Sequence, residues 1–483
     1  MTVRQHVLMM LSLGAFQTVA FCQNEIEALR YSSAEAAQTA RSLGMNGAYS
    51  AVGADMSAYF GNPAGIGVYK RTSIEGALSH DNHLITAAYA GEEDKYLKSR
   101  LNIANIGFTA TRSTRNPRVK SINYGVAYAK TNNFYQSFTI EGEAETSLMQ
   151  QFALQANGIQ PDDLYATLPF SAGPAYDVYG IDPADESGSY YVPATSGLAR
   201  QRKQVTREGR QNETALALAV NLDVRFYLGG SVNIVGIYFS EVSDYSENYP
   251  SENRVNRISF NEDLVTSATG FAAQFGILYK VNDYVRLSAA RRSKTALYLQ
   301  DIYSTSAFSE LGFLSYFSES PELISDYLLK LPAKSSFGVA GVIGKYGMVT
   351  VDLENSDYTS VKMEGTDANS YNYAAENELF QTIFRPSTAV RFGLESRILG
   401  TYYVRSGYGI MRNPLSDEAG AANAPIQSIA FGVGYRDDHF FADLAMRTST
   451  LKSTYFLYDP ALVQPASLKD KTTQVMLSAG FRF

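Results

Sequence analysis

Residues 42–67 read SLGMNGAYSAVGADMSAYFGNPAGIG, a stretch dense in Gly, Ala and Ser with almost no long charged side chains. Small residues let two backbones approach closely. Glycine interrupts the stretch too often for a long helix, and β-branched residues are too few for a sheet. Pro63, which follows Asn62, marks a natural break. This composition predicts a compact plug of short helical turns packed inside a larger structure.

A Gly-rich loop is also typical of phosphate binding, so a nucleotide site is the alternative interpretation of these residues. The stretch contains no G-x-x-x-x-G-K-[ST] motif, and no strand precedes it to present a dinucleotide site. The plug is therefore the better-supported interpretation.

Composition narrows the class of protein and the kind of partner. The 483 residues would suggest about three ordinary domains, whereas a large barrel is one closed sheet. Acidic residues (48 Asp and Glu) outnumber basic ones (41 Lys and Arg), which argues against a nucleic acid partner. Tyr occurs 34 times and Trp is absent. Abundant Tyr is typical of the aromatic girdles of membrane barrels and also occurs in secreted β proteins.

Residues 1–22 have the pattern of a secretory signal peptide. Arg4 and His6 precede an apolar segment at residues 7–16, and the residues that follow allow cleavage after Cys22. A lipoprotein with Cys22 lipidated is the alternative, although Phe21 is bulky for the preceding position. Cleavage after Cys22 leaves no cysteine, and so no disulfide, thiolate nucleophile or Cys-based metal site.

The stretch at residues 42–67 resembles the N-terminal hatch of the FadL family, outer-membrane transporters of long-chain fatty acids and other hydrophobic compounds. The resemblance is carried by the segments Ser42-Leu43-Gly44-Met45, Gly47-Ala48, Asp55-Met56-Ser57-Ala58 and Asn62-Pro63-Ala64-Gly65. The family usually has Gly after the Met, where this chain has Asn46.

This resemblance implies a location in the bacterial outer membrane and a gating role for the hatch. Ligand binding would shift the hatch N-terminus, and cargo would leave sideways through an opening beside a kinked strand. The residues implied for the hatch and its gating are Gly44, Gly47, Asn62, Pro63 and Ala64. Gly107 or Gly125 would mark the wall irregularity, or they would only relieve crowding in the lumen.

The rest of the chain predicts an all-β fold, a transmembrane antiparallel β-barrel of about fourteen strands with the hatch in its lumen. After residue 22 there is no run of about 18 apolar residues, and only helices and closed barrels pair every backbone group in lipid. Apolar and small or polar residues alternate along many segments. The predicted strands cover residues 72–90, 101–112, 119–130, 213–222, 229–240, 268–280, 284–294, 335–344, 346–358, 387–397, 401–411, 427–436, 439–449 and 472–483.

The connections between these strands alternate between short and long, as the turns and external loops of a membrane barrel do. The long ones include residues 131–212, 241–267 and 295–334. The chain is thus divided into a signal peptide (1–22), a lead-in and hatch (23–70) and a barrel (71–483).

The last strand ends in an aromatic residue. Val475, Leu477, Ala479, Phe481 and Phe483 share one face. A terminal Phe resembles the signal read by the outer-membrane barrel assembly machinery, which makes that machinery a predicted partner through Phe483. The alternative is an apolar last strand of a soluble sheet.

No catalytic constellation is visible, so the sequence predicts neither an enzyme nor a cofactor. His80 and His83 would need further ligands to bind a metal, and no metal site is predicted. The carboxylates Asp352, Glu354 and Asp357 are expected to face a wet lumen or a loop.

Two segments of the long loops have apolar residues at helical spacing. They are Leu323, Ile324, Tyr327, Leu328 and Leu331 in one loop, and Leu148, Met149, Phe152 and Ala156 in the other. Such helices would form an apolar groove that captures a lipid-like ligand, or they would pack on one another and cap the barrel.

The predicted function is outer-membrane transport of long-chain fatty acids or other hydrophobic small molecules, with membrane lipid as the surroundings. A FadL-like barrel that acts as a partner or scaffold in protein secretion is the alternative. A general diffusion porin is disfavoured by the hatch.

Overall fold

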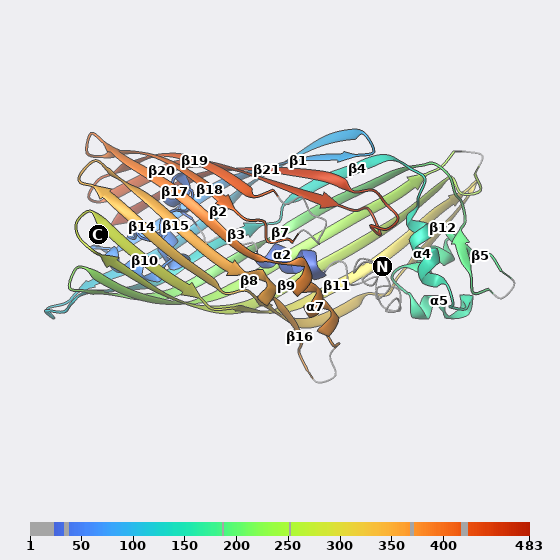
Figure 1. Cartoon of the computed structure of the whole chain (residues 1–483), viewed down its shortest axis with the longest axis horizontal. Coiled ribbons are helices and arrows are strands. Elements are labelled where there is room, and N and C mark those ends of the chain that lie inside the picture. Colours follow the sequence, from blue (N-terminus) through green and yellow to red (C-terminus); the bar gives the residue numbers. More distant parts are fainter. Residues whose placement is uncertain (1–23, 33–37, 186–187, 251–252, 368–370, 417–423) are drawn as a thin grey trace, which may run out of the picture.

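The computed structural model describes residues 24–32, 38–185, 188–250, 253–367, 371–416 and 424–483. The predicted signal peptide lies outside these described residues. The strands form a closed antiparallel barrel with 14 strand positions, closed where β1 (Ser73–Tyr89) pairs with β21 (Ala466–Arg482). Short turns lie at one end of this barrel, and long segments with helices lie at the other (Figure 1).

The large sheet is built from strands that differ widely in length. They are β1, β2 (Glu92–Ser113), β3 (Val119–Asn133), β4 (Gln136–Ala144), β7 (Ala199–Leu222), β8 (Phe226–Asn248), β9 (Arg257–Lys280), β10 (Val285–Arg292), β11 (Thr295–Leu311), β12 (Leu314–Glu319), β13 (Leu323–Leu331), β14 (Lys334–Ile343), β15 (Gly347–Asp357), β16 (Lys362–Gly365), β17 (Pro386–Ile398), β18 (Tyr402–Met411), β19 (Ile426–Arg436), β20 (Phe440–Tyr455) and β21. A small separate sheet pairs β5 (Ile181–Pro183) with β6 (Tyr191–Pro193).

Short helices accompany the sheet. They are α2 (Asn24–Ser32), α3 (Ala40–Gly44), η1 (Met56–Tyr59), η2 (Pro63–Val68), α4 (Leu148–Ala156), α5 (Pro161–Thr167), α6 (Ala172–Asp177), η3 (Tyr358–Ser360) and α7 (Ala374–Ile383). Among the described residues, no helix has the length and apolar character needed to cross a membrane.

Some positions in the barrel wall consist of two consecutive strands. β10 and β11 both pair with β9, and they pair with β14 and β13 respectively on their other side. β4 likewise continues β3 along β7. The predicted barrel of about fourteen antiparallel strands is confirmed.

The alternation along each strand separates the two faces of the wall. On β9, Phe271 and Phe275 point outward and are exposed, while Ala272 and Gln274 point into the lumen and are buried. The same pattern recurs around the barrel, because successive side chains of a strand point to opposite faces. The outside therefore carries a band of large apolar side chains, and the lumen carries small and polar ones.

Several strands continue well past the predicted ends. The strand predicted at residues 213–222 is β7 and begins at Ala199, and the one predicted at 268–280 is β9 and begins at Arg257. The predicted long loops at 131–212, 241–267 and 295–334 are therefore wrong in part. Those added segments are mostly polar on their outward face, as at Arg200 and Asp263, although Ile258 and Phe260 of β9 are buried. The neighbouring strands supply the hydrogen bonds that fix them as strands.

The predicted helix at residues 321–331 is also wrong, because this segment contains β13. Its residues pair with β11 from Thr295↔Leu331 to Tyr303↔Leu323. Apolar residues at helical spacing can equally lie on two faces of a strand, and tertiary pairing decides between the two. The helix predicted around Leu148 is confirmed as α4.

The segment from Gln38 to Tyr69, called the plug below, lies inside the barrel. Hydrogen bonds connect it to many wall strands, among them Ala40 to Ser478 on β21, Asn62 to Ile277 on β9 and Tyr59 to Phe108 on β2. Asn46 has a φ of 55°, a left-handed conformation that Asn tolerates better than other non-Gly residues. This conformation explains how Asn can stand where the resembling family has Gly.

Beyond the plug, apolar clusters fill the lumen. An apolar section, called the chamber below, surrounds α2 and is lined by residues of β8, β9, β11, β13 and α7. A second cluster at the far end joins α4, α5 and α6 to the tips of the long strands, and these helices with β5, β6 and β12 are called the cap. The barrel is thus filled at three successive levels.

The close approach of plug and wall yields a testable prediction at Gly276. A Cβ there would collide with the Asn62 side chain, whereas a Cβ at Gly236 of β8 would meet open space. We expect Gly276→Ala to destabilise the detergent-solubilised barrel by about 1–3 kcal/mol, because overpacking forces the plug to shift. Thermal unfolding measures this loss. Gly236→Ala is the control, and equal melting temperatures for both variants would contradict the tight fit.

Candidate functional site

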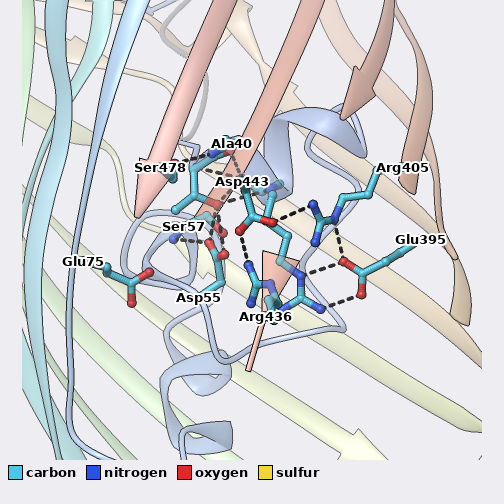
Figure 2. A network of polar contacts seen from close by, with 12 residues as sticks. Ala40, Asp55, Ser57, Glu75, Glu395, Arg405, Arg436, Asp443 and Ser478 are labelled. Carbon is cyan, nitrogen blue, oxygen red and sulfur yellow. Dashed lines mark hydrogen bonds and ion pairs between the residues drawn. The ribbon is translucent and has the colours of Figure 1, made fainter. Parts of the chain in front are cut away.

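A chain of buried charges joins the plug to the wall (Figure 2). Arg41 of α3 forms two hydrogen bonds with Glu395 of β17, at 2.8 and 2.7 Å. Arg405 of β18 binds the same carboxylate at 2.6 Å and Asp443 of β20 at 2.8 Å, and Arg436 of β19 also donates to Asp443. Cations and anions alternate along the chain, so each charge is compensated where water is largely excluded.

The plug is also fixed by short-range caps. Thr39 donates to the Asp55 carboxylate at 2.9 Å, and that carboxylate accepts the backbone N–H of Ser57 at the start of η1. Asn62 does the same for Ala64 at the start of η2. Its amide nitrogen also donates to the backbone oxygens of Ser50 (3.1 Å) and Ile277 (3.2 Å). Asn62 therefore connects two parts of the plug to the wall.

The structure places all five residues that the sequence implied for the hatch in close contact with the wall or at turns of the plug. Gly44 lies against Gly432, and Gly47 has a φ of 77°. Pro63 follows Asn62 at the start of η2, where its missing N–H is not needed, and it lies against Gly229. Ala64 is fully buried. Their gating role remains a prediction.

An open cavity lies between the plug and the wall, with about 1210 Å³ of space including its solvent-open part. Its lining is mixed, with apolar residues such as Phe60 and Leu331 beside polar ones. Glu213 pairs with Arg292 at 2.6 Å, and Asp352 accepts the backbone N–H groups of Tyr49 and Ser50. Glu354 also lines this cavity. Charged and polar groups thus lie next to the plug.

The chamber beyond this cavity is apolar and is occupied by α2. Tyr31 of α2 is fully buried and packs edge to face against Phe134 and Phe239, with ring centroids 5.9 and 6.3 Å apart. Leu297 and Leu299 of β11 belong to the same cluster. A hydrophobic molecule in this part of the lumen would compete with α2 for the same surface.

The structure separates the residues predicted to capture a ligand. Tyr327 and Leu331 line the chamber, whereas Leu148 and Phe152 are buried in the cap. Leu323 and Ile324 are exposed at the start of β13, where they point to opposite faces, and Leu328 is partly buried. These residues do not form one groove, so the packing of the α4 face within the cap is the arrangement observed.

The wall has a gap between β2 and β3. The ladder between these strands runs from Ser113↔Ser121 to Asn105↔Ala129 and stops there, although β2 continues along β1 to Glu92. Both strands are irregular at this point: Ala104 bulges from the β1–β2 ladder and Thr131 from the β3–β7 ladder. Bulges bend a strand and end its pairing, so they account for the gap. We call this gap the slit.

Side chains bridge the slit. Lys98 of β2 binds Glu208 of β7 at 3.3 Å and lies 3.9 Å from the centre of the Tyr135 ring. Arg100 lies over the same ring at 4.9 Å. These contacts are exposed pairs, which contribute about 1 kcal/mol or less each. They can open at little cost, in contrast to the buried charges around the plug.

A second cavity lies behind the slit. It is lined by Asp81 and His83 of β1, Ala104 of β2 and Lys130 of β3, among others. Gln38 of the plug lines both this cavity and the one above the plug. The two cavities therefore adjoin at Gln38.

Neither glycine considered for a wall irregularity lies at the slit. Gly107 and Gly125 sit in regular pairs, Gly107↔Ala127 and Thr109↔Gly125. A Cβ at either position would collide with the plug, at Met56 or Tyr59. That prediction of an irregularity at these glycines is wrong, and the alternative of relieved crowding fits the contacts. In the described residues, no group of three His, Cys, Asp or Glu side chains could hold a metal ion.

Sequence reasoning missed the charge chain and the slit. Glu395, Arg405 and Asp443 could have been found, because each is a charged residue on the lumen face of a predicted strand. Ala104 and Thr131 carry no sequence mark of a bulge.

Proteins of known structure share this architecture. No protein-family model and no curated protein matches the sequence. Solved structures do match: the Pseudomonas putida toluene transporter TodX has a TM-score of 0.55 at 14% identity, covering 93% of this chain and 99% of that one. The chain has the FadL-type fold.

Two further structures agree with that fold over the same share of the chain. A Pseudomonas aeruginosa FadL homologue has a TM-score of 0.56 at 12% identity, and the Ralstonia pickettii toluene transporter TbuX has 0.50 at 14% identity. Each covers 93% of this chain and 99% of its own. At these identities the likeness establishes the FadL-type fold, and the function is argued separately below.

The docking of α2 yields a prediction about pH. Burial raises the pKa of the Glu27 carboxyl, and Asp301 of β11 and Glu241 of β8 raise it further, while Arg30 and the Tyr327 hydroxyl lower it. Between its ordinary pKa and this raised pKa, the Glu27 carboxyl is protonated in docked α2 and ionised in free α2. Docking is therefore favoured at low pH and weakens as the pH rises through this range.

The chain has no Trp, so Leu29→Trp gives a single reporter that packs against the chamber. We expect its emission to shift to longer wavelength between about pH 5 and about pH 9, and Glu27→Gln to flatten this change. An unchanged shift in the Gln variant would refute the role of Glu27.

Proposed function

We propose that this protein is an outer-membrane channel for hydrophobic small molecules, which enter the chamber and leave sideways through the slit. The gap between β2 and β3 is the observation that carries the proposal. It interrupts the wall beside the band of exposed apolar side chains, and it adjoins the cavities of the lumen. Long-chain fatty acids or compounds of similar hydrophobicity are the proposed cargo.

The chamber supports a hydrophobic cargo. Burying a CH₂ group gains about 0.8 kcal/mol, so an acyl or aromatic molecule binds where apolar side chains line the lumen. Tyr327 and Leu331, predicted for ligand capture, lie in this lining beside Leu299. α2 already covers part of it, so cargo binding would displace α2. A wide aqueous pore would offer no comparable gain.

The slit supports a sideways exit. The plug fills the lumen on the short-turn side and is fixed by buried charges, whereas the slit is bridged by exposed contacts of Lys98. Opening the slit therefore costs less than moving the plug out of the barrel. Ile103 of β2 lies beside the slit, points outward and is 63% exposed. It would contact the acyl chains that receive the cargo.

We also propose that the last strand directs assembly in the outer membrane. Phe481 and Phe483 are exposed on β21 and at the chain end next to it. The backbone N–H of Phe483 donates to the backbone oxygen of Thr72 at 2.9 Å, which fixes the terminal residue beside the first strand. An exposed aromatic end of this kind is available for recognition by the barrel assembly machinery.

Cross-linking the slit tests the proposed exit. We would introduce Lys98→Cys and Glu208→Cys and join the two thiols with a short bismaleimide, in a chain whose single native Cys lies in the predicted signal peptide. Uptake of a labelled hydrophobic compound should fall to the level of cells without the protein. The pair Lys330→Cys with Glu364→Cys is the control, because it joins β13 to β16, which already pair.

Normal uptake after complete cross-linking between positions 98 and 208 would contradict the sideways exit. A barrel that carries no hydrophobic compound and instead retains a large protein partner would favour the secretion alternative.

A further inference from the structure

Lys130 stands at the inner edge of the slit with its charge poorly satisfied. It directly follows Ala129, the last β3 residue paired with β2. Its side chain is only 9% exposed, and its Nζ lies 3.9 Å from the Asp81 carboxylate. That distance is too long for a hydrogen bond, and Lys130 Nζ donates none to the described residues. A buried ammonium group has three donors and needs acceptors for them.

The Asp81 oxygens already accept from three amide groups and lie beyond hydrogen-bond distance of Lys130. Gln474 donates to Oδ1 at 3.0 Å, while Asn102 and Asn133 donate to Oδ2 at 2.9 and 3.3 Å. Asp81 therefore offsets part of the positive charge of the site but accepts no hydrogen bond from the Lys130 ammonium group. A ligand oxygen in the cavity would do so.

The surroundings of the slit favour an anion. Arg100 and Arg210 lie close enough to repel Lys130, and Lys98 bridges the slit to Glu208. Lys130 and these three residues are four cations near the carboxylates of Asp81 and Glu208, and the Asp470 carboxylate, 3.5 Å from His83 of the cavity lining, is a third. The cavity behind the slit holds about 750 Å³ including solvent-open space, and Arg447 lies on its lining. This volume accommodates a polar head group.

The outer face of β2 provides a place for an apolar tail. Leu101 and Ile103 point outward beside the slit and are 69% and 63% exposed, and Ile106 continues the stripe toward the apolar band. An amphiphile with its head at Lys130 would pass through the slit and lay its tail on these residues. The tail would then remain in the hydrocarbon region of a membrane.

We propose that the slit holds an anion-binding site, with Lys130 as the principal donor, for the acidic head group of a membrane amphiphile. The inference rests on the proposed membrane location and is independent of whether cargo crosses the slit. Charge-assisted hydrogen bonds are about twice as strong as neutral ones, so the charge of the head should decide binding. The head group is the carboxylate of a cargo molecule or the phosphate of a resident lipid.

Binding of three amphiphiles with the same tail tests this site. Dodecanoate, dodecyl phosphate and dodecanol would be titrated into the delipidated, detergent-solubilised protein. We expect at least one of the anions to bind about tenfold or more tightly than the alcohol. Lys130→Met should abolish this preference and Lys130→Arg should retain it. Lys95→Met, an exposed lysine of β2 paired with Glu93, should leave it unchanged.

The two anions distinguish the source of the head group. Tighter binding of dodecyl phosphate, with a phospholipid that co-purifies with the native protein and is lost in Lys130→Met, assigns the site to a resident lipid. Tighter binding of dodecanoate assigns it to acidic cargo.

Equal binding of all three amphiphiles, or a preference that survives in Lys130→Met, would overturn the proposal. Thermal unfolding shows whether each variant is folded. If Lys130→Met does not fold, Lys130→Arg still tests the proposal, because loss of the anion preference in a folded Arg variant would contradict it. Uptake of a neutral hydrocarbon, measured with and without the slit cross-link, reports on the transport proposal separately.

Discussion

The buried charge chain that joins Arg41 of the plug to Glu395, Arg405, Asp443 and Arg436 of the wall constrains everything else in the lumen. Such a chain adds little net stability over apolar packing, but removing one member costs about 3–5 kcal/mol because a buried charge is left uncompensated. The plug can therefore rearrange locally, yet leaving the barrel would break the contacts between Arg41 and Glu395 and leave the charges of the wall unbalanced. A molecule that enters the lumen must pass beside the plug or leave through the wall.

The wall complements this constraint. Glycines on the lumen face of β8 and β9 let Asn62 and Pro63 approach the strands closely, which seals the side of the barrel with short turns. Elsewhere in the wall, bulges at Ala104 and Thr131 part β2 from β3. Rigid closure and a weakly bridged slit are thus built into one sheet. The chamber and the two adjoining cavities connect these features, with α2 as the occupant that a cargo would displace.

The barrel could be predicted from the sequence because lipid and lumen impose opposite demands on alternate residues, as Phe271 and Ala272 illustrate. The extensions of β7 and β9 could not be predicted in the same way, since their outward residues lie beyond the apolar band and are mostly polar. The sequence of the β13 segment predicts a helix because its apolar residues lie at helical spacing. Its pairing with β11 is a long-range interaction that the local sequence does not indicate. The plug was recognisable by its small residues. The slit depends on bulges at Ala104 and Thr131, and neither residue type indicates a bulge in the sequence.

Photolabelling of the membrane-embedded barrel tests the central claim, that hydrophobic molecules use the chamber and the slit. A hydrocarbon bearing a diazirine would be activated on the protein in proteoliposomes, and the labelled peptides would be identified by mass spectrometry. The account predicts adducts in the chamber at Leu297 and Leu299 and at the slit on the inner residues near Lys130, which the bilayer alone does not reach. Adducts that instead follow the plug between Phe60 and Tyr69, with none in the chamber or the slit, would contradict it.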